Sequence, residues 1–325
     1  MSVAVCLLLY SVAVVVLGPG LLVRLTRAGV APRLGVAAWL VGIGSVVAAW
    51  AAGAAFLAAE LARDWTRPGG AVASACFAML QQAALGRYGM LVQLGPLALA
   101  MLAATALVVL TWRLSRCLVR TRTSTHQHAR MARTAGRHLD GLPAVVLDAP
   151  ERLAYCVAGR PHTIVLTSAA LDALDDPHLD AVLSHERAHL AGRHHLILAA
   201  SRGLAATLPR IDLFTTAAAE ITRLLEMCAD DAAARTHGSR TVLAALLALS
   251  GTAPTPSGAL GATGVEVLAR AQRLAAPPPP AERMRARLAL TATSILLAAG
   301  PLLTGTLAAT GLALCSPMTG FPMTG

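Results

Sequence analysis

The sequence predicts a mainly helical α+β membrane protein, with about four transmembrane helices and one domain outside the bilayer that contains a small sheet. The first observation behind this class is composition: 56% of the 325 residues are hydrophobic, only 14% are charged, and the mean hydropathy is +0.62. Such a chain is too apolar for a soluble protein of this length. The second observation is order, because long uncharged runs lie near both ends and short β-branched runs lie between them.

Four uncharged runs are long enough to cross a bilayer, which takes about 20 residues in a helix. They are Val3–Val23, Leu34–Ala59, Met90–Trp112 and Leu288–Cys315. A secretory signal peptide is the alternative for the first run, but no basic residue precedes it. Pro68–Gly86, between the second and third runs, is a candidate interfacial helix or an ordinary connection.

Arginine placement predicts how these spans are oriented, because basic residues near span ends concentrate on the cytoplasmic side. All 27 basic residues are arginines, and they cluster after the first run, after the third run and before the fourth. We therefore expect both termini and the loop 60–89 to lie outside the cell. The arginines form no basic face with aromatic platforms, so they indicate contact with the lipid bilayer and no direct binding of nucleic acid.

The spans divide the chain into segments with different expected roles. We expect a membrane region with three spans at 1–112, a basic juxtamembrane linker at 113–142, a cytoplasmic domain at 143–287, a fourth span at 288–315 and a short tail at 316–325.

The cytoplasmic domain is expected to combine short strands with longer helices. The runs AVVL, AYCV and TIVLTS are separated by turn residues and predict a small sheet. We expect His162–Thr167 to be an edge strand that can pair with an extended substrate. Asp172–Asp180 begins a helix, and Ala217–Thr236 forms a second strong one. Leu196–Leu208 is too short for a span, so we expect a helix against the membrane or packed on the domain.

The first of these helices leads into LSHERAHLAGRHH, residues 183–195, which contains an HExxH motif. His185 and His189 are four residues apart, so both imidazoles leave one helix face and can hold one metal ion. Glu186 lies beside the first histidine. In zinc-dependent hydrolysis two imidazoles hold Zn²⁺, one position stays open for water, and an adjacent carboxylate accepts the proton of that water. We therefore predict His185 and His189 as zinc ligands and Glu186 as the catalytic base.

Two residues compete for the third protein position on the zinc ion. His195 completes the longer pattern HExxHxxGxxH, but no Met-turn follows it and no clear turn ends the helix before it. Glu226 lies in the later helix, and Asp230 shares its face four residues further on. The glutamate can bind zinc while the aspartate accepts a hydrogen bond from the free N–H of a ligating histidine. We favour Glu226 as the third ligand and Asp230 as the supporting carboxylate.

These motifs together resemble the BlaR/MecR-type membrane zinc peptidases, in their short actinobacterial form without a penicillin-binding sensor domain. The resemblance rests on TIVLTS, LSHERAHLAGRHH and LLEMCADDAAAR, in that order between three N-terminal spans and a last span. This group is related to the HtpX and CAAX-prenyl-protease gluzincins. The resemblance implies a gluzincin-like zinc peptidase domain in the cytoplasm, with His185, His189 and Glu226 as ligands, Glu186 as base and Asp230 as their support.

The resemblance also implies a membrane-embedded zinc metalloendopeptidase that cleaves a cytoplasmic winged-helix repressor or a related regulator in signal transduction. Only SPMTGFPMTG follows Cys315, so the β-lactam stimulus of the sensor-bearing members does not carry over. One alternative is a housekeeping protease that acts on damaged or prenylated membrane proteins. Another is a non-catalytic membrane signalling protein with a structural metal site, but a structural site has no need of a base such as Glu186.

Overall fold

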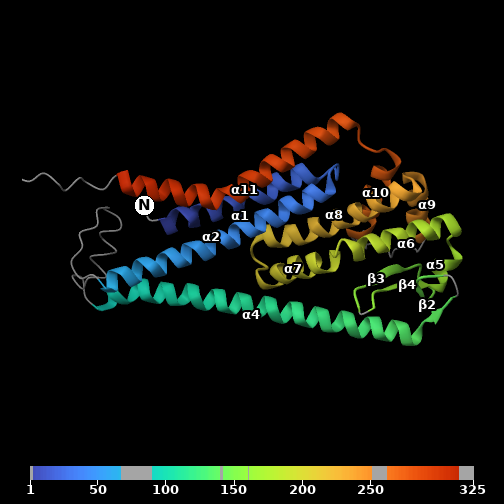
Figure 1. Cartoon of the computed structure of the whole chain (residues 1–325), viewed down its shortest axis with the longest axis horizontal. Coiled ribbons are helices and arrows are strands. Elements are labelled where there is room, and N and C mark those ends of the chain that lie inside the picture. Colours follow the sequence, from blue (N-terminus) through green and yellow to red (C-terminus); the bar gives the residue numbers. More distant parts are fainter. Residues whose placement is uncertain (1–2, 67–89, 140–141, 160, 251–261, 315–325) are drawn as a thin grey trace, which may run out of the picture. The chain divides into compact units, whose positions relative to one another are not determined.

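The computed structural model describes residues 3–66, 90–139, 142–159, 161–250 and 262–314 (Figure 1). The chain forms two compact units. The first unit comprises residues 1–21, 38–113 and 291–325, and the second comprises residues 22–37 and 114–290. Most described residues are helical and a small sheet lies in the second unit, which confirms the predicted α+β class.

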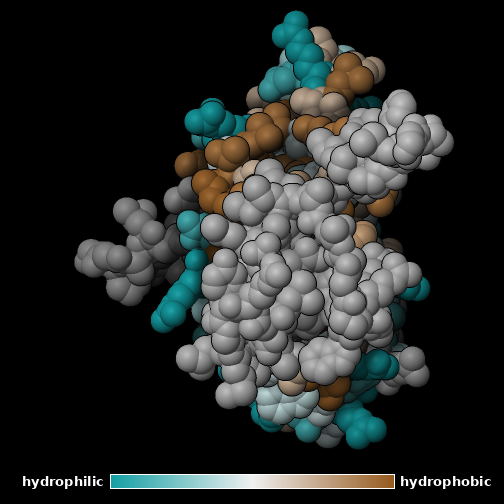
Figure 2. Space-filling model, turned by 90° about the vertical axis from the view of Figure 1, so that its left-hand side faces the viewer, coloured by the Kyte–Doolittle hydropathy of each residue, from teal (hydrophilic) through white to brown (hydrophobic). Residues whose placement is uncertain are grey.

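The first unit is built from long apolar helices. Within the described residues, three helices are long and apolar enough to cross a membrane. They are α1 (Val3–Thr26), α2 (Pro32–Thr66) and α11 (Pro280–Leu314), whose qualifying stretches are Val3–Thr26, Pro32–Phe56 and Pro280–Ala308. Large hydrophobic side chains remain exposed on them, such as Val16 at 68% and Leu302 at 73%. Figure 2 shows hydrophobic side chains of this kind, in brown, on the surface of the molecule. Such surfaces indicate a membrane protein, because lipid covers them without cost.

Polar side chains join these helices inside the first unit. The Trp50 indole N–H of α2 donates to Ser11 Oγ of α1 at 3.0 Å. The Tyr10 hydroxyl of α1 donates to the Leu297 carbonyl of α11 at 2.9 Å. A Cβ at Gly300 would lie 2.3 Å from the Tyr10 ring, so this glycine lets the ring approach α11.

The run Met90–Trp112 forms the first half of α4 (Met90–Ala135), one continuous helix that also includes most of the basic segment after it. Most side chains of this run lie outside the described residues, so the third crossing stays a prediction. The orientation of the spans stays a prediction too. Pro68–Gly86 lies outside the described residues.

The sheet of the second unit has the strand order β1-β2-β4-β3. Its strands are β1 (Arg137–His138), β2 (Val145–Leu147), β3 (Ala154–Val157) and β4 (Thr163–Thr167). β4 runs parallel to β2 and antiparallel to β3, with Val165 opposite Tyr155. The expectation that His162–Thr167 is an edge strand is therefore wrong. All five β4 residues are buried, as in a central strand covered on both faces, and the edge strands are β1 and β3.

Among the described residues, six helices lie entirely within the second unit. They are α5 (Ser168–Asp172), α6 (Asp176–Ala191), α7 (His194–Thr207), α8 (Asp212–His237), α9 (Ser239–Ser250) and α10 (Ala262–Ala275). α6 packs against α8 and on the sheet, and Val182, Leu183, Leu166 and Ala233 share one buried core. α7 packs on α8, so the segment expected against the membrane or on the domain lies on the domain. This packing turns the inner face of α6 toward α8.

The two ends of α6 follow from local chemistry. Asp175 caps its first turn by accepting a hydrogen bond from the His178 backbone N–H at 3.0 Å, and Pro177 fits that turn. α6 ends at Gly192, and Arg193 then adopts a left-handed backbone with φ of 50°. A break therefore does separate the motif helix from α7, contrary to the expectation that no turn lies before His195.

The connection between α1 and α2 belongs to the second unit and is held by arginines of α8 and α10. Arg223 donates to the Thr26 carbonyl at 2.9 Å, and Arg273 donates to the Gly29 carbonyl at 2.9 Å. Gly29 has a φ of 61°, and a Cβ there would lie 2.3 Å from Met227 Sδ. Glycine is needed at this position because both the backbone angle and the space exclude a side chain.

We expect Gly29→Ala to lower the free energy of unfolding by about 1–3 kcal/mol, through the left-handed backbone and the displaced Met227 side chain. Thermal unfolding in detergent micelles measures the change. Gly44→Ala is the matched control, since a Cβ at Gly44 meets nothing within 4 Å. Equal melting temperatures for the two variants would contradict the tight contact between the connection and α8.

Candidate active site

Three side chains from α6 and α8 converge on one point. The Nε2 atoms of His185 and His189 are 3.1 Å apart. Glu226 reaches them from α8, with Oε2 3.5 Å from the Nε2 atom of His185 and Oε1 3.4 Å from that of His189. The four-residue spacing aligns the two imidazoles on α6, and the packing of α6 on α8 brings the carboxylate opposite them. The structure therefore brings together the three residues that the sequence proposes as ligands.

The spacing of these donor atoms fits a metal ion. A tetrahedral zinc site with bonds of about 2.0–2.1 Å places neighbouring donors about 3.3–3.4 Å apart. The two Nε2 atoms lie 3.1 Å apart, and the Glu226 carboxylate approaches them with a different oxygen each, at 3.5 Å from His185 and 3.4 Å from His189. Within the described residues, this trio is the group of His, Cys, Asp and Glu side chains close enough to hold one ion. Two imidazoles and a carboxylate also leave a fourth position for water.

A buried aspartate orients the first histidine. Asp230 Oδ1 lies 3.1 Å from His185 Nδ1, and the aspartate side chain is only 1% exposed. A carboxylate in this position accepts the Nδ1–H of the imidazole and so leaves Nε2 free to bind metal. The i, i+4 spacing of Glu226 and Asp230 on α8 therefore places a ligand and its supporting carboxylate side by side.

Arg270 of α10 neutralises both carboxylates, and sequence reasoning missed it. Its Nε donates to Asp230 Oδ2 at 2.8 Å, its Nη2 to Asp230 Oδ1 at 2.7 Å, and its Nη1 lies 3.1 Å from Glu226 Oε2. A buried carboxylate, Asp230, one turn from a half-buried one, Glu226, requires a counter-charge, which is the signal that the sequence offered. The sequence does not indicate which arginine supplies this charge, because Arg270 lies on a separate helix, α10, which begins 32 residues after Asp230.

These contacts set the charges of the cluster. Burial opposes charge on His185, but its hydrogen bonds with Asp230 and Glu226 raise its pKa to about 9. Burial lowers the pKa of His189 to about 4. Burial also opposes charge on Glu226 and Asp230, yet His185 and Arg270 hold both carboxyl pKa values at about 2. Near neutral pH, both carboxylates are therefore ionised and His189 offers an unprotonated nitrogen.

A third histidine contacts the cluster from outside. His194 Nδ1 lies 2.8 Å from His189 Nδ1, and His194 is buried at the start of α7. A Cβ at Gly192 would lie 2.4 Å from His194 Nε2, so the glycine makes room for this ring. His195, the rival third ligand, is outside the trio, and its buried Nδ1 has no hydrogen-bond partner in the described chain. The break after Gly192 thus turns His194 toward His189 in place of His195.

Glu186 lies beside the cluster in a buried pocket. It is 7% exposed, and burial raises the pKa of its carboxyl, which favours holding a proton. The nearby Cys156 of β3 lowers the pKa of this carboxyl and so offsets part of the effect of burial. The pocket has a volume of about 140 Å³, and its lining includes Ala154, His185, Glu186 and Glu226. The edge strand, the base and two of the proposed ligands, His185 and Glu226, therefore line one cavity.

An HExxH helix, a glutamate from the next long helix and a small sheet beside them define a metallopeptidase domain. Residues 119–290 match the model of peptidase family M48, and this match covers more than half of the chain. The protein therefore belongs to peptidase family M48, a family of zinc metallopeptidases, which confirms the family level of the resemblance. The BlaR/MecR subtype stays a prediction. No curated protein and no solved structure matches the chain.

We expect Asp230→Asn to weaken metal binding about 10–100-fold, because the amide supports the His185 ring less well than the carboxylate does. Competition with a chromophoric chelator measures the affinity. Asp212→Asn is the matched control, since it removes the same charge from an exposed position on the same helix. Equal affinity in the Asp230 and Asp212 variants would contradict the supporting role.

Proposed function

We propose that the protein is a membrane-embedded zinc metalloendopeptidase, with Zn²⁺ held by His185, His189 and Glu226. The observation that carries this proposal is the convergence of two imidazole nitrogens and the Glu226 carboxylate, with separations of 3.1 to 3.5 Å, beside the buried carboxylate of Glu186. A zinc ion held there would act as a Lewis acid that polarises water and the scissile carbonyl. A structural role alone would not require Glu186 next to an open coordination position.

Glu186 acts as the general base in this proposal. Its carboxylate accepts the proton of the attacking water and passes that proton to the leaving amine. Burial supports the first step, because a carboxylate with a raised pKa is a better proton acceptor and holds the proton until it transfers that proton to the leaving amine.

The outer edge of β3 supports an extended peptide substrate. In the described part of the chain, β3 pairs only with β4, so its other edge presents unpaired backbone groups. Ala154 of β3 lines the same pocket as Glu186. A peptide that added to this edge would align its backbone by hydrogen bonds and pass beside the base. This arrangement suits an endopeptidase, because strand addition recognises backbone and needs no free terminus.

The proposed substrate is a cytoplasmic winged-helix repressor or a related regulator. Two observations support it: the order of motifs resembles BlaR/MecR-type peptidases, and arginine placement favours a cytoplasmic domain. The alternative substrates are damaged or prenylated membrane proteins.

We expect Glu186→Gln to lower kcat/KM on a peptide substrate about 10²–10⁴-fold while the protein retains its metal, because the base is lost and the ligands remain. Peptide hydrolysis and metal content are measured on the same purified sample. Glu282→Gln is the control, since it removes an exposed glutamate at the start of α11. A Glu186→Gln enzyme with full activity would overturn the assignment of the base.

We expect cells with the wild-type protein to contain cleaved regulator fragments that are missing in a Glu186→Gln strain. Quantitative sequencing of protein N-termini from both strains measures this difference. Loss of fragments from transcriptional regulators supports the signalling substrate. Loss of fragments from membrane proteins alone would instead establish the housekeeping alternative.

A further inference from the structure

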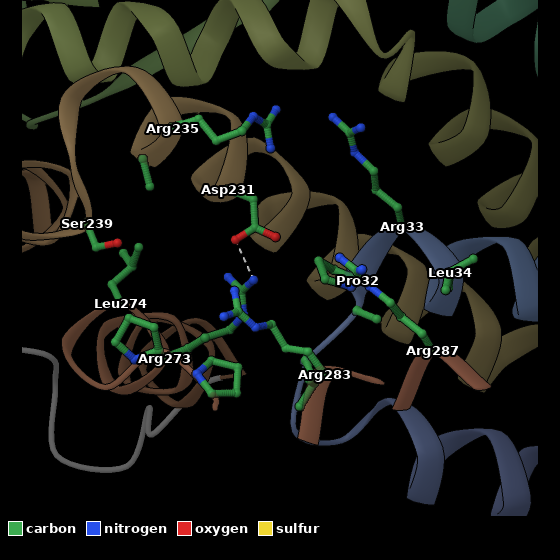
Figure 3. Close-up of a pocket in the computed structure, with 15 residues that line it drawn as sticks. Pro32, Arg33, Leu34, Asp231, Arg235, Ser239, Arg273, Leu274, Arg283 and Arg287 are labelled. Carbon is green, nitrogen blue, oxygen red and sulfur yellow. Dashed lines mark hydrogen bonds and ion pairs between the residues drawn. The ribbon is translucent and has the colours of Figure 1, made fainter. Parts of the chain in front are cut away.

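A second cavity in the same unit is lined by arginines. It has a volume of about 650 Å³ and shares no lining residue with the pocket at Glu186. Its basic side chains are Arg33, Arg235, Arg273, Arg283 and Arg287, and its acidic side chain is Asp231 (Figure 3). We call this cavity the arginine pocket.

Most of the positive charge in the arginine pocket is uncompensated. The charge of Arg273 is compensated, because its guanidinium pairs with Asp231 and donates a hydrogen bond to the Gly29 carbonyl. The side chains of the other four arginines, Arg33, Arg235, Arg283 and Arg287, form no hydrogen bond or ion pair with another described residue. Four like charges around one cavity repel one another and attract a negatively charged ligand.

The arginines come from separate elements and line one cavity. Arg33 belongs to α2, Arg235 to α8, and Arg283 and Arg287 to α11. In Figure 3, the guanidinium groups of Arg33 and Arg235 point toward each other, and the dashed line marks the ion pair of Asp231 with Arg273. Guanidinium groups donate paired N–H bonds to the oxygens of phosphate, which makes arginine the preferred side chain for this anion.

The position of the pocket along the chain indicates where the phosphate comes from. Arg33 is the second residue of α2, and Arg283 and Arg287 lie in the first turns of α11. Both helices continue from there as candidate membrane spans. Basic residues at the ends of spans lie at the depth of lipid headgroups. Apolar side chains also line the pocket, including Leu34 and Leu274, and these can contact the glycerol and upper acyl chain of a lipid.

We propose that the arginine pocket binds a phosphate group carried by an anionic ligand, supplied by the headgroup of a membrane phospholipid. The ligand neutralises the arginines of α2, α8 and α11 at once. It thereby joins the beginnings of two candidate spans to α8, the helix that carries Glu226. This site is separate from the proposed chemistry, and its occupancy is measurable without any peptidase assay.

The test measures lipid binding to the full-length protein in neutral detergent micelles by native mass spectrometry. Phosphatidylglycerol is titrated against phosphatidylcholine, which carries the same phosphate without a net negative charge, and against inorganic phosphate. The double variant Arg283→Gln/Arg287→Gln removes two pocket charges at exposed positions. The double variant Arg240→Gln/Arg285→Gln is the matched control, because both residues are exposed arginines outside the pocket lining.

We expect phosphatidylglycerol to bind the wild type at least tenfold more tightly than phosphatidylcholine, and the pocket variant to lose at least tenfold of that affinity. The control variant keeps the wild-type affinity. If inorganic phosphate competes for the pocket as effectively as the lipid, the same anion site is supported with a soluble source. Equal losses in the two double variants, or no preference for either anion over phosphatidylcholine, would overturn the proposal.

Discussion

The packing of α6 against α8 is the contact on which the candidate active site depends. α6 alone supplies two imidazoles and a carboxylate, and α8 alone supplies two acids one turn apart. The shared core of Val182, Leu183 and Ala233 brings the helices together. Only then does Glu226 come within 3.5 Å of both imidazoles. The apolar contact between α6 and α8 therefore sets the distances among the proposed ligands, because close packing leaves these side chains little freedom to move apart.

Burying this much charge requires compensation, and the cluster supplies it internally. Asp230 is 1% exposed and Arg270 is 13% exposed, so both charges are largely removed from water. A buried ion whose partner is lost commonly costs about 3–5 kcal/mol. Arg270 contacts Asp230 and Glu226 together, and Asp230 contacts His185. The same network therefore has two effects. It compensates the charge of the carboxylates, and it orients the imidazole of His185 for metal binding.

Helical periodicity explains which parts of the site the sequence could predict. Pairs four residues apart, such as His185 with His189 and Glu226 with Asp230, lie on one helix face in any α-helix. Arg270 and His194 could not be predicted in this way, because a separate helix and the left-handed turn at Arg193 bring them in. The order of strands in the sheet could not be predicted from periodicity either. The run TIVLT was correctly predicted to be a strand, but its central position depends on pairing with β2 and β3. The long apolar runs predicted the membrane class because a bilayer imposes both length and composition.

The most direct test of the central claim is zinc K-edge X-ray absorption on the purified, metal-loaded protein. The proposed site predicts an inner shell of nitrogen and oxygen at about 2.0–2.2 Å, with the outer-shell scattering of two imidazoles. Scattering from three imidazoles would mean that a histidine such as His194 or His195 replaces Glu226. A shell that contains sulfur would also contradict the account, because it would place a cysteine such as Cys156 on the metal.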